Sequence, residues 1–178
     1  KDIFPYNDSN FIDYATSEYR SDFLDIWLSA NCKFTLSSDL GLGSLPMFFN
    51  KPFLFADFFP LGRMLSFVPK IIHLPRIAYL NNKIMTLKEM IETDVIYTID
   101  GQFYSKLGIK VLDNSSEDIL NATKEMLKNI EKDFNITPLN KIFWENLNAK
   151  WNSYLYSKNV TTLNRKELFF KYSKDKIN

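Results

Sequence analysis

Two glycines and a serine follow a short β-prone stretch in the pattern of a phosphate-binding turn. Residues 33–38 lead into Gly41, Gly43 and Ser44, after which a short helix is expected. Glycine lets the backbone pass close to a ligand, and the first N–H groups of a helix attract a phosphate or diphosphate. The Ser44 hydroxyl would be a further hydrogen-bond donor. The candidate contacts are Asp39, Gly41, Leu42, Gly43 and Ser44.

The same turn has a second interpretation. Gly41 and Gly43 also suit a tight strand-to-helix turn that binds nothing. Asp39 is placed either to accept a hydrogen bond from a ligand hydroxyl or to cap the turn through its own backbone, which is the commoner use of aspartate there. The spacing alone leaves both interpretations open.

The composition removes several other kinds of chemistry. The chain has 178 residues with 22 basic and 21 acidic side chains, so no basic surface argues for nucleic-acid binding. Cys32 and His73 are the only cysteine and the only histidine, which excludes a disulfide framework and argues against zinc and histidine-rich sites. We therefore expect no metal and no bound cofactor. For His73, within the connection 60–75, we expect a packed or hydrogen-bonded loop histidine; a catalytic base is the alternative.

Capping signals and periodicity predict the elements that position these residues. Ser21 caps a helix whose first turn carries Asp22 and Asp25. Thr86 and Glu89 fit a capping box. The expected elements are a helix at 21–31, a strand at 33–38, a short helix at 44–50, a strand at 53–56, a long connection at 60–75, a short helix from Thr86, a strand at 108–112, and helices at 114–132 and 138–156.

The order helix, strand, turn, helix, strand in residues 21–57 predicts an α/β unit with parallel strands. We expect one domain over residues 1–178 with a three-layer α/β/α Rossmann-like fold and a mostly parallel sheet, whose ligands bind at the carboxyl ends of the strands. Residues 1–19 would form an irregular leader, and 138–178 the last helix and a basic tail. The connection 60–75 has a length typical of functional loops.

Apolar side chains recur at helical spacing along the predicted C-terminal helix. Such a stripe usually packs in a core or a domain interface. Because residues 141–178 carry eight basic against three acidic side chains, the alternative is peripheral contact with an anionic membrane surface. The longest apolar runs, around 46–60, are too short and too interrupted for a transmembrane helix. The stripe consists of Phe143, Trp144, Leu147, Trp151, Tyr154 and Leu155.

The segment from Asp39 to Pro52, with the strand after it, resembles the donor domain of GT-B glycosyltransferases. In those enzymes an Asp-x-Gly turn, a short helix and a Lys-Pro pair precede the next strand, as Asp39, Gly41 and Lys51-Pro52 do here. Heptosyltransferase-like families show the same spacing, with a His where this chain has Ser44. The wider run over about residues 10–65, with a looser match over 86–131, looks like a bacterial family of surface-carbohydrate glycosyltransferases.

This resemblance implies a nucleotide-sugar donor held by its diphosphate at residues 41–44. It implies that the nucleoside lies near residues 19–21 and that the loop 57–62 flanks the same cleft. Arg20 and Arg63 are then candidates for charge-assisted phosphate contacts, since an arginine fork matches phosphate geometry; the alternative is that both are solvated surface residues. The donor-loop candidates are Tyr19, Arg20, Ser21, Asp57 and Arg63.

The function implied by the resemblance is transfer of a sugar from a nucleotide-sugar to a surface polysaccharide or glycoconjugate. The acceptor would be a carbohydrate or a lipid-linked sugar, and the protein would lie in the cytoplasm, with peripheral contact at the inner face of the membrane. In GT-B enzymes the catalytic base commonly comes from the N-terminal domain. A two-domain transferase needs about twice this length, so we expect that the N-terminal GT-B domain is missing from this chain, and no catalytic residue is assigned.

Two alternatives to this function stay open. One is a non-catalytic α/β interaction domain that docks a partner or a membrane through its aromatic C-terminal helix. The other is an α/β sugar-phosphate or pyruvyl transferase that uses the same phosphate turn.

Overall fold

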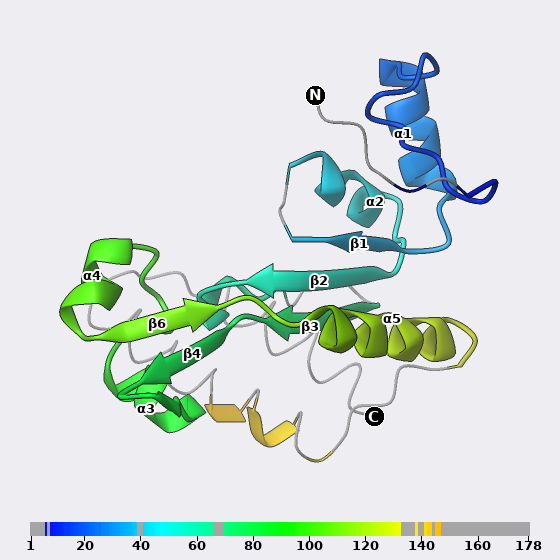
Figure 1. Cartoon of the computed structure of the whole chain (residues 1–178). Helices are drawn as coiled ribbons and strands as arrows, with labels where there is room; N and C mark the ends of the chain where they lie inside the picture. Colours follow the sequence, from blue (N-terminus) through cyan, green and yellow to red (C-terminus); the bar gives the residue numbers. More distant parts are fainter. Residues whose placement is uncertain are drawn as a thin grey trace, which may run out of the picture.

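Two three-stranded sheets, joined through an almost continuous pair of strands, form the centre of the molecule (Figure 1). The computed structural model describes residues 6, 8–38, 41–65, 70–132, 138, 141–143 and 145–146. Its elements in chain order are α1 (Asp22–Asn31), β1 (Thr35–Ser37), the 3-10 helix η1 (Leu42–Ser44), α2 (Leu45–Phe48), β2 (Phe53–Phe58), the 3-10 helix η2 (Leu61–Arg63), β3 (Ile71–Pro75), β4 (Ile77–Leu80), β5 (Lys83–Ile84), α3 (Leu87–Glu92), α4 (Gly101–Lys106), β6 (Ile109–Leu112) and α5 (Ser116–Ile130).

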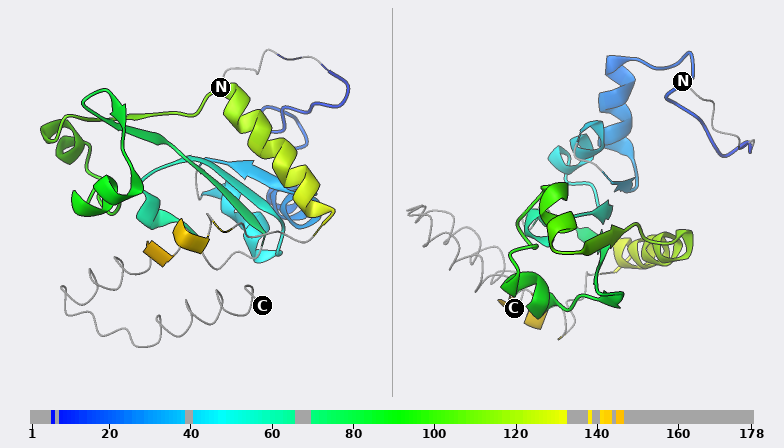
Figure 2. Two further views of the ribbon diagram at one scale, coloured as in Figure 1. Left: turned by 90° about the horizontal axis from the view of Figure 1, so that it is seen from below. Right: turned by 60° about the vertical axis from the view of Figure 1, so that its left-hand side comes forward.

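The first sheet has the order β1-β2-β3 and is parallel throughout. β2 is its central strand, and it is buried on both faces, as its nearly continuous apolar sequence predicts. Phe53 and Phe55 pack on one face with Met47 of α2. On the other face Leu54 packs with Met126 of α5. The sheet therefore lies between α2 on one side and α5, which runs beside it in both views of Figure 2, on the other.

A β-bulge at Asp57 ends the regular part of β2. Asp57 has a φ of 52°, and the register with β3 shifts between Ala56 and Phe58. The extra residue turns Phe58 to the face that Phe55 occupies, where the two rings stack with centroids 4.5 Å apart. The bulge thus extends the aromatic core toward the end of the strand.

The second sheet has the order β5-β4-β6 and is antiparallel. Asn81 and Asn82 join β4 to β5 with φ values of 51° and 60°, which is the backbone of a type I′ hairpin turn. Asparagine tolerates this left-handed conformation, so the Asn-Asn pair was the sequence signal for the hairpin. The core beside the second sheet contains the buried residues Ala78, Val95, Ile96 and Ile109.

The chain is therefore a mixed α/β protein with a parallel three-stranded sheet and helices around it. The expectation of one mostly parallel sheet is corrected, because the predicted strand at 108–112 pairs antiparallel with β4 in a second sheet. The expectation of a long loop at 60–75 is also wrong, because its last residues form β3. Prolines at 60, 69 and 75 suggested a loop, but Pro75 needs no N–H bond at the last position of an edge strand.

The predicted caps at Ser21 and Thr86 are confirmed. Ser21 accepts a hydrogen bond from Leu24 N, and Thr86 and Glu89 form a reciprocal capping box at α3. The helix predicted at 44–50 is a 3-10 turn followed by α2. It stops because Asn50 is left-handed, with a φ of 55°, which allows Lys51 N to bond to Pro46 O.

The structure describes only the first part of the predicted C-terminal helix at 138–156. Residues 141–143 and 145–146 are helical, and Phe143 packs against the core of the second sheet. That one member of the aromatic stripe contributes to a core. Trp144, the later stripe residues and the basic tail lie outside the described residues, as do residues 1–5 of the predicted leader. The described residues of the leader form turns without a helix or strand.

Candidate functional site

The glycine turn lies at the carboxyl end of β1, as expected. β1 ends at Ser37, and Leu42 begins η1. Gly43 packs so closely on the strand that a Cβ there would lie 2.3 Å from Ser37 Oγ and 2.9 Å from Ser37 Cβ. A glycine is therefore required at 43 by the close approach of the turn to the strand. Asp39 and Leu40 lie outside the described residues.

The other residues of the turn have different surroundings. Gly41 would carry a Cβ with no atom within 4 Å, so packing does not require glycine at this position. Ser44 Oγ donates a hydrogen bond of 2.8 Å to Gly41 O, and Ser44 N bonds to the same oxygen. The Ser44 hydroxyl proton is therefore used within the turn. The N–H groups of Leu42 and Gly43 precede the first bond of η1, so the 3-10 helix supplies no acceptor for them.

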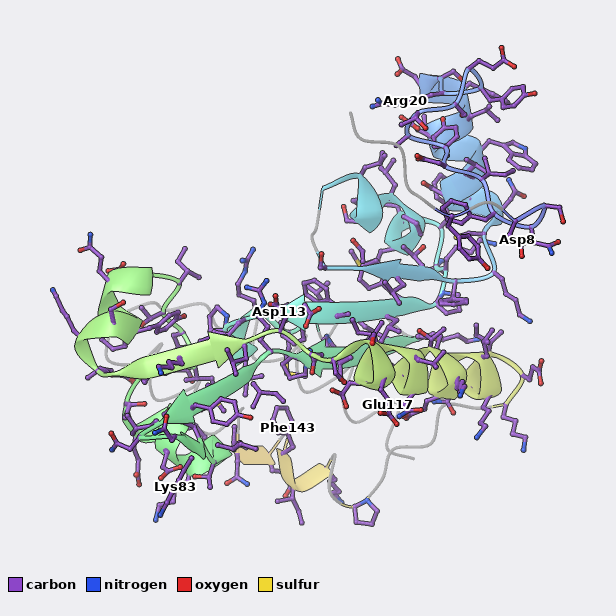
Figure 3. All side chains as sticks on the ribbon, in the orientation of Figure 1. Asp8, Arg20, Lys83, Asp113, Glu117 and Phe143 are labelled. Atoms are coloured by element: carbon purple, nitrogen blue, oxygen red, sulfur yellow. The ribbon has the colours of Figure 1, made fainter. Side chains whose placement is uncertain are left out.

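Three of the donor-loop candidates lie together at the N-terminal end of α1. Tyr19 is 64% exposed, and Arg20 and Ser21 are exposed too. Tyr14 supports this loop, since its hydroxyl donates to Ser21 O and accepts from Ser21 N. Desolvation raises the pKa of Tyr14. Figure 3 shows Arg20 at the outer end of α1, well separated from Asp113 at the centre of the molecule.

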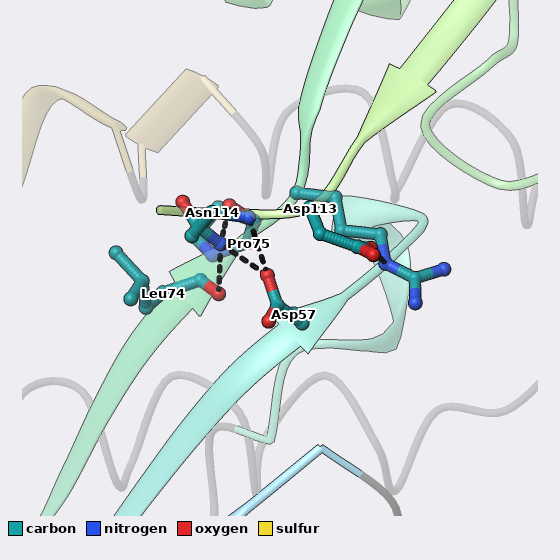
Figure 4. Close-up of polar contacts among 6 residues, drawn as sticks. Asp57, Leu74, Pro75, Asp113 and Asn114 are labelled. Atoms are coloured by element: carbon teal, nitrogen blue, oxygen red, sulfur yellow. Dashed lines mark hydrogen bonds and ion pairs between the residues drawn. The ribbon is translucent and has the colours of Figure 1, made fainter. Parts of the chain in front are cut away.

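Asp57 lies near Asp113, and its carboxylate faces Asn114, the residue before the α5 cap (Figure 4). Asp57 Oδ1 accepts one hydrogen bond from Asn114 N and one from Asn114 Nδ2, each 2.7 Å long. Asn114 Nδ2 also donates to Pro75 O at 3.0 Å. Asp57, which was predicted as a donor-loop residue, thus helps to link the end of β2 to the end of β3 and to the segment before α5.

Arg63 is exposed at the end of η2. The preceding residue, Gly62, is held against the second sheet's core: Gly62 N donates to Ile96 O at 2.7 Å. The structure therefore places the described candidates in separate groups at the β1–α2 turn, at the start of α1, and at the β2 end with η2.

Two polar residues beside Asp57 were not among the predicted site residues. Arg76, between β3 and β4, pairs with Asp113 through Nε and Oδ1 at 2.7 Å. Asn114 is the other. A short-range signal existed, because Asp-Asn after a strand and before the Ser115 cap is typical of a chain reversal. Nothing local identified their partners, which lie 37 and 57 residues away along the chain.

His73 is a strand residue in the aromatic core and not a loop residue. Its ring lies edge-on to Phe58, with centroids 5.6 Å apart, and Nε2 accepts a hydrogen bond from Leu65 N at 3.1 Å. Desolvation by burial lowers the pKa of His73 to about 4. The expected packed and hydrogen-bonded histidine is confirmed, while its expected loop is corrected to β3.

Within the described ranges, no group of three or more His, Cys, Asp or Glu side chains could hold a metal ion. No helix in the same part of the chain has the length and apolar character to cross a bilayer. Comparisons with protein-family models, with curated proteins and with solved structures gave no match. The case for a function therefore depends on the geometry of this chain.

Proposed function

We propose that this chain is the donor-binding domain of a GT-B-like glycosyltransferase and binds the diphosphate of a nucleotide-sugar at residues 41–44. The observation that carries the proposal is the position of this glycine turn, at the carboxyl end of a parallel strand and at the start of the helical crossover to β2. Ligands of open parallel sheets bind at that edge. A three-layer, Rossmann-like arrangement is part of the proposal.

The geometry favours residues 41–43 over the other candidates as the anion contact. Gly41 and Leu42 are exposed, and the open space at Gly41 lets a ligand approach the backbone. Ser44 acts differently from the expectation. By bonding to Gly41 O, it holds the turn closed and leaves recognition to backbone N–H groups.

Calorimetric titration of the full chain with nucleoside diphosphates and nucleotide-sugars tests this proposal. We expect binding by the wild type and at least tenfold weaker binding by Gly41→Val, since a Cβ at this position lies in open space and the larger side chain would occupy the approach to the turn. The matched control is Gly101→Val, because Gly101 has equally open surroundings on α4, outside this turn. Failure of the wild type to bind any of these compounds would contradict the proposal.

The interaction-domain alternative makes a different prediction for the same variants. The described structure favours it through the large apolar side chains on its surface, of which Phe48 of α2 is 79% exposed. In that case Gly41→Val and the wild type would both leave nucleotides unbound, and Phe48→Glu would weaken capture of a partner. The acceptor, the membrane contact and the catalytic base of a complete GT-B enzyme are likewise proposals, not findings.

A further inference from the structure

The carboxyl ends of β2 and β3 carry a carboxylate and a guanidinium at the same edge of the sheet as the glycine turn. Asp57 lies in the bulge that ends β2, and Arg76 directly follows β3. Their segments are adjacent, because Arg76 N donates a hydrogen bond of 3.0 Å to Phe58 O. β1 ends at Ser37 on this edge too, since the three strands are parallel. Neighbouring strands are about 5 Å apart, so β2 and β3 end roughly 5 and 10 Å across the sheet from β1.

The Asp57 carboxylate is held on one side and open on the other. Oδ1 accepts both N–H groups of Asn114 at 2.7 Å, which fixes the orientation of the carboxylate (Figure 4). Within the described part of the chain, Oδ2 accepts no hydrogen bond. Asp57 is half-buried, and Oδ2 is reached by solvent. Oδ2 is therefore an oriented acceptor that is available to a ligand.

The charges around this acceptor favour hydroxyl groups over an anion. Arg76 pairs with Asp113 through Nε at 2.7 Å, and the Arg76 side chain is 43% exposed. A guanidinium has five N–H donors, so this pair leaves donors for a ligand. Two carboxylates stand beside one guanidinium here, which disfavours a further negative group. A hydroxyl can donate to a carboxylate or accept from a guanidinium, so two adjacent hydroxyls fit Asp57 and Arg76 together.

We propose that Asp57 and Arg76 bind two adjacent hydroxyl groups of the nucleotide-sugar whose diphosphate lies at residues 41–44. One hydroxyl donates to Asp57 Oδ2, and the other accepts from the Arg76 guanidinium. Asn114 is a positioning residue, because it orients the carboxylate. This inference rests on the proposed function and adds the part of the ligand beyond the diphosphate. The two hydroxyls belong either to the transferred sugar or to the ribose, since both are linked to the diphosphate.

Calorimetric titration of Asp57→Asn in the full chain tests the hydroxyl contact. Asparagine keeps an oxygen for Asn114 and places an NH2 group where Oδ2 was, so an acceptor becomes a donor. It also tolerates the left-handed backbone at position 57. The probes are the glucose esters of UDP, ADP and GDP and inorganic pyrophosphate. We expect the glucose ester that the wild type binds to bind at least tenfold more weakly to the variant, and pyrophosphate to bind equally to both.

The matched control is Asp94→Asn. Asp94 is exposed and has the same left-handed backbone, with a φ of 57°, but it lies just beyond α3. This control should bind every probe as the wild type does. Arg76→Lys is a second test, because it keeps the charge and removes the planar fork, and it should also weaken binding of the glucose ester. Circular dichroism identifies the folded variants, on which the comparison is made.

A 2′,3′-dideoxynucleoside diphosphate distinguishes the two sources of the hydroxyls. Asp57→Asn weakens the ordinary diphosphate but not the dideoxy analogue if the ribose is bound, and it weakens only the glucose ester if the sugar is bound. Folded variants that bind every probe as the wild type does, or that lose pyrophosphate as much as the glucose ester, overturn the hydroxyl contact while the diphosphate proposal stands. A wild type that binds none of the probes overturns both.

Discussion

Asp57 holds Asn114 at both its backbone N–H and its side-chain amide, through two hydrogen bonds of 2.7 Å to the same carboxylate oxygen. The contact joins the bulge at the end of β2 to the residue that precedes the α5 cap. Asn114 also bonds to Pro75 O, and the neighbouring Arg76–Asp113 pair links the same two chain segments. This junction determines how the parallel sheet, the antiparallel sheet and α5 meet.

Removing the amide at position 114 should destabilise the protein. Asn114→Ala deletes the side-chain donor to Asp57 and to Pro75, and we expect a loss of about 1–3 kcal/mol in the free energy of unfolding, because a bond to a charged, partly buried acceptor is lost. Urea denaturation measures this difference. Asn121→Ala, at an exposed position of α5, is the matched control and should change stability by less than about 0.5 kcal/mol. Equal effects of the two substitutions would refute a role for the junction.

His73 should make the protein acid-labile. Its folded-state pKa is about 4, against an ordinary value of 6.5, so between these values the unfolded state binds more protons than the folded state. The contribution of neutral His73 to the free energy of unfolding is therefore fully present above about pH 6.5. It is lost as the pH drops toward 4, by at most about 3 kcal/mol. Chemical denaturation at a series of pH values gives the profile.

The comparison for this pH effect is His73→Gln, which cannot titrate and whose side-chain oxygen can accept the Leu65 N–H. Its profile should lack the His73 contribution over this interval and fall only at the acid end, where Glu89, with an ordinary pKa of 4.5, begins to be protonated in the unfolded state. Hydrogen bonds from Thr86 and Ser115 lower the pKa values of Glu89 and Asp118, and their contribution is lost at more acid pH in both proteins. A slope between pH 6.5 and 4 that is equal in wild type and variant would show that His73 is not its source.

The two glycines of the β1–α2 turn should respond differently to alanine. Gly43→Ala places a Cβ against both the Oγ and the Cβ of Ser37, so rotation of the hydroxyl alone does not remove the clash. We expect a loss of about 1–3 kcal/mol, which is typical of overpacking. Gly41→Ala meets no atoms and is the matched control. Thermal unfolding of both variants checks this expectation. Adding Ser37→Ala to Gly43→Ala should restore part of the lost stability. Equal melting temperatures for the two single variants would disprove the close approach.

Gly62 and Gly101 form a second pair with opposite expectations. A Cβ at Gly62 would lie 2.6 Å from Ile96 O and 2.8 Å from a ring carbon of Tyr97, and backbone cannot rotate away. Gly62→Ala should therefore destabilise by about 3 kcal/mol. Gly101→Ala, in the open first turn of α4, should stabilise by about 0.5–1 kcal/mol because alanine loses less backbone entropy. Denaturant unfolding measures both, and a neutral Gly62→Ala would contradict the contact.

The sequence by itself determined the local elements of this protein. Ser21, Thr86 and Ser115 satisfy helix N–H groups only a few residues away, so their caps could be read directly, and the apolar run at Phe53 gave the central strand. The glycine turn after β1 was predicted in its correct place for the same reason. Its function as a diphosphate site stays a prediction.

Only the tertiary structure decided how those elements pair and what the polar residues do. Periodicity does not encode which edge a strand joins, so β3 and the antiparallel partner of β6 required contacts between distant segments. The need for glycine at 43 depends on Ser37 across the turn, and the place of Asp57 depends on Asn114 in a segment 57 residues later. Packing and hydrogen bonds of this kind arise only when the chain has folded, because they join atoms that no local pattern brings together.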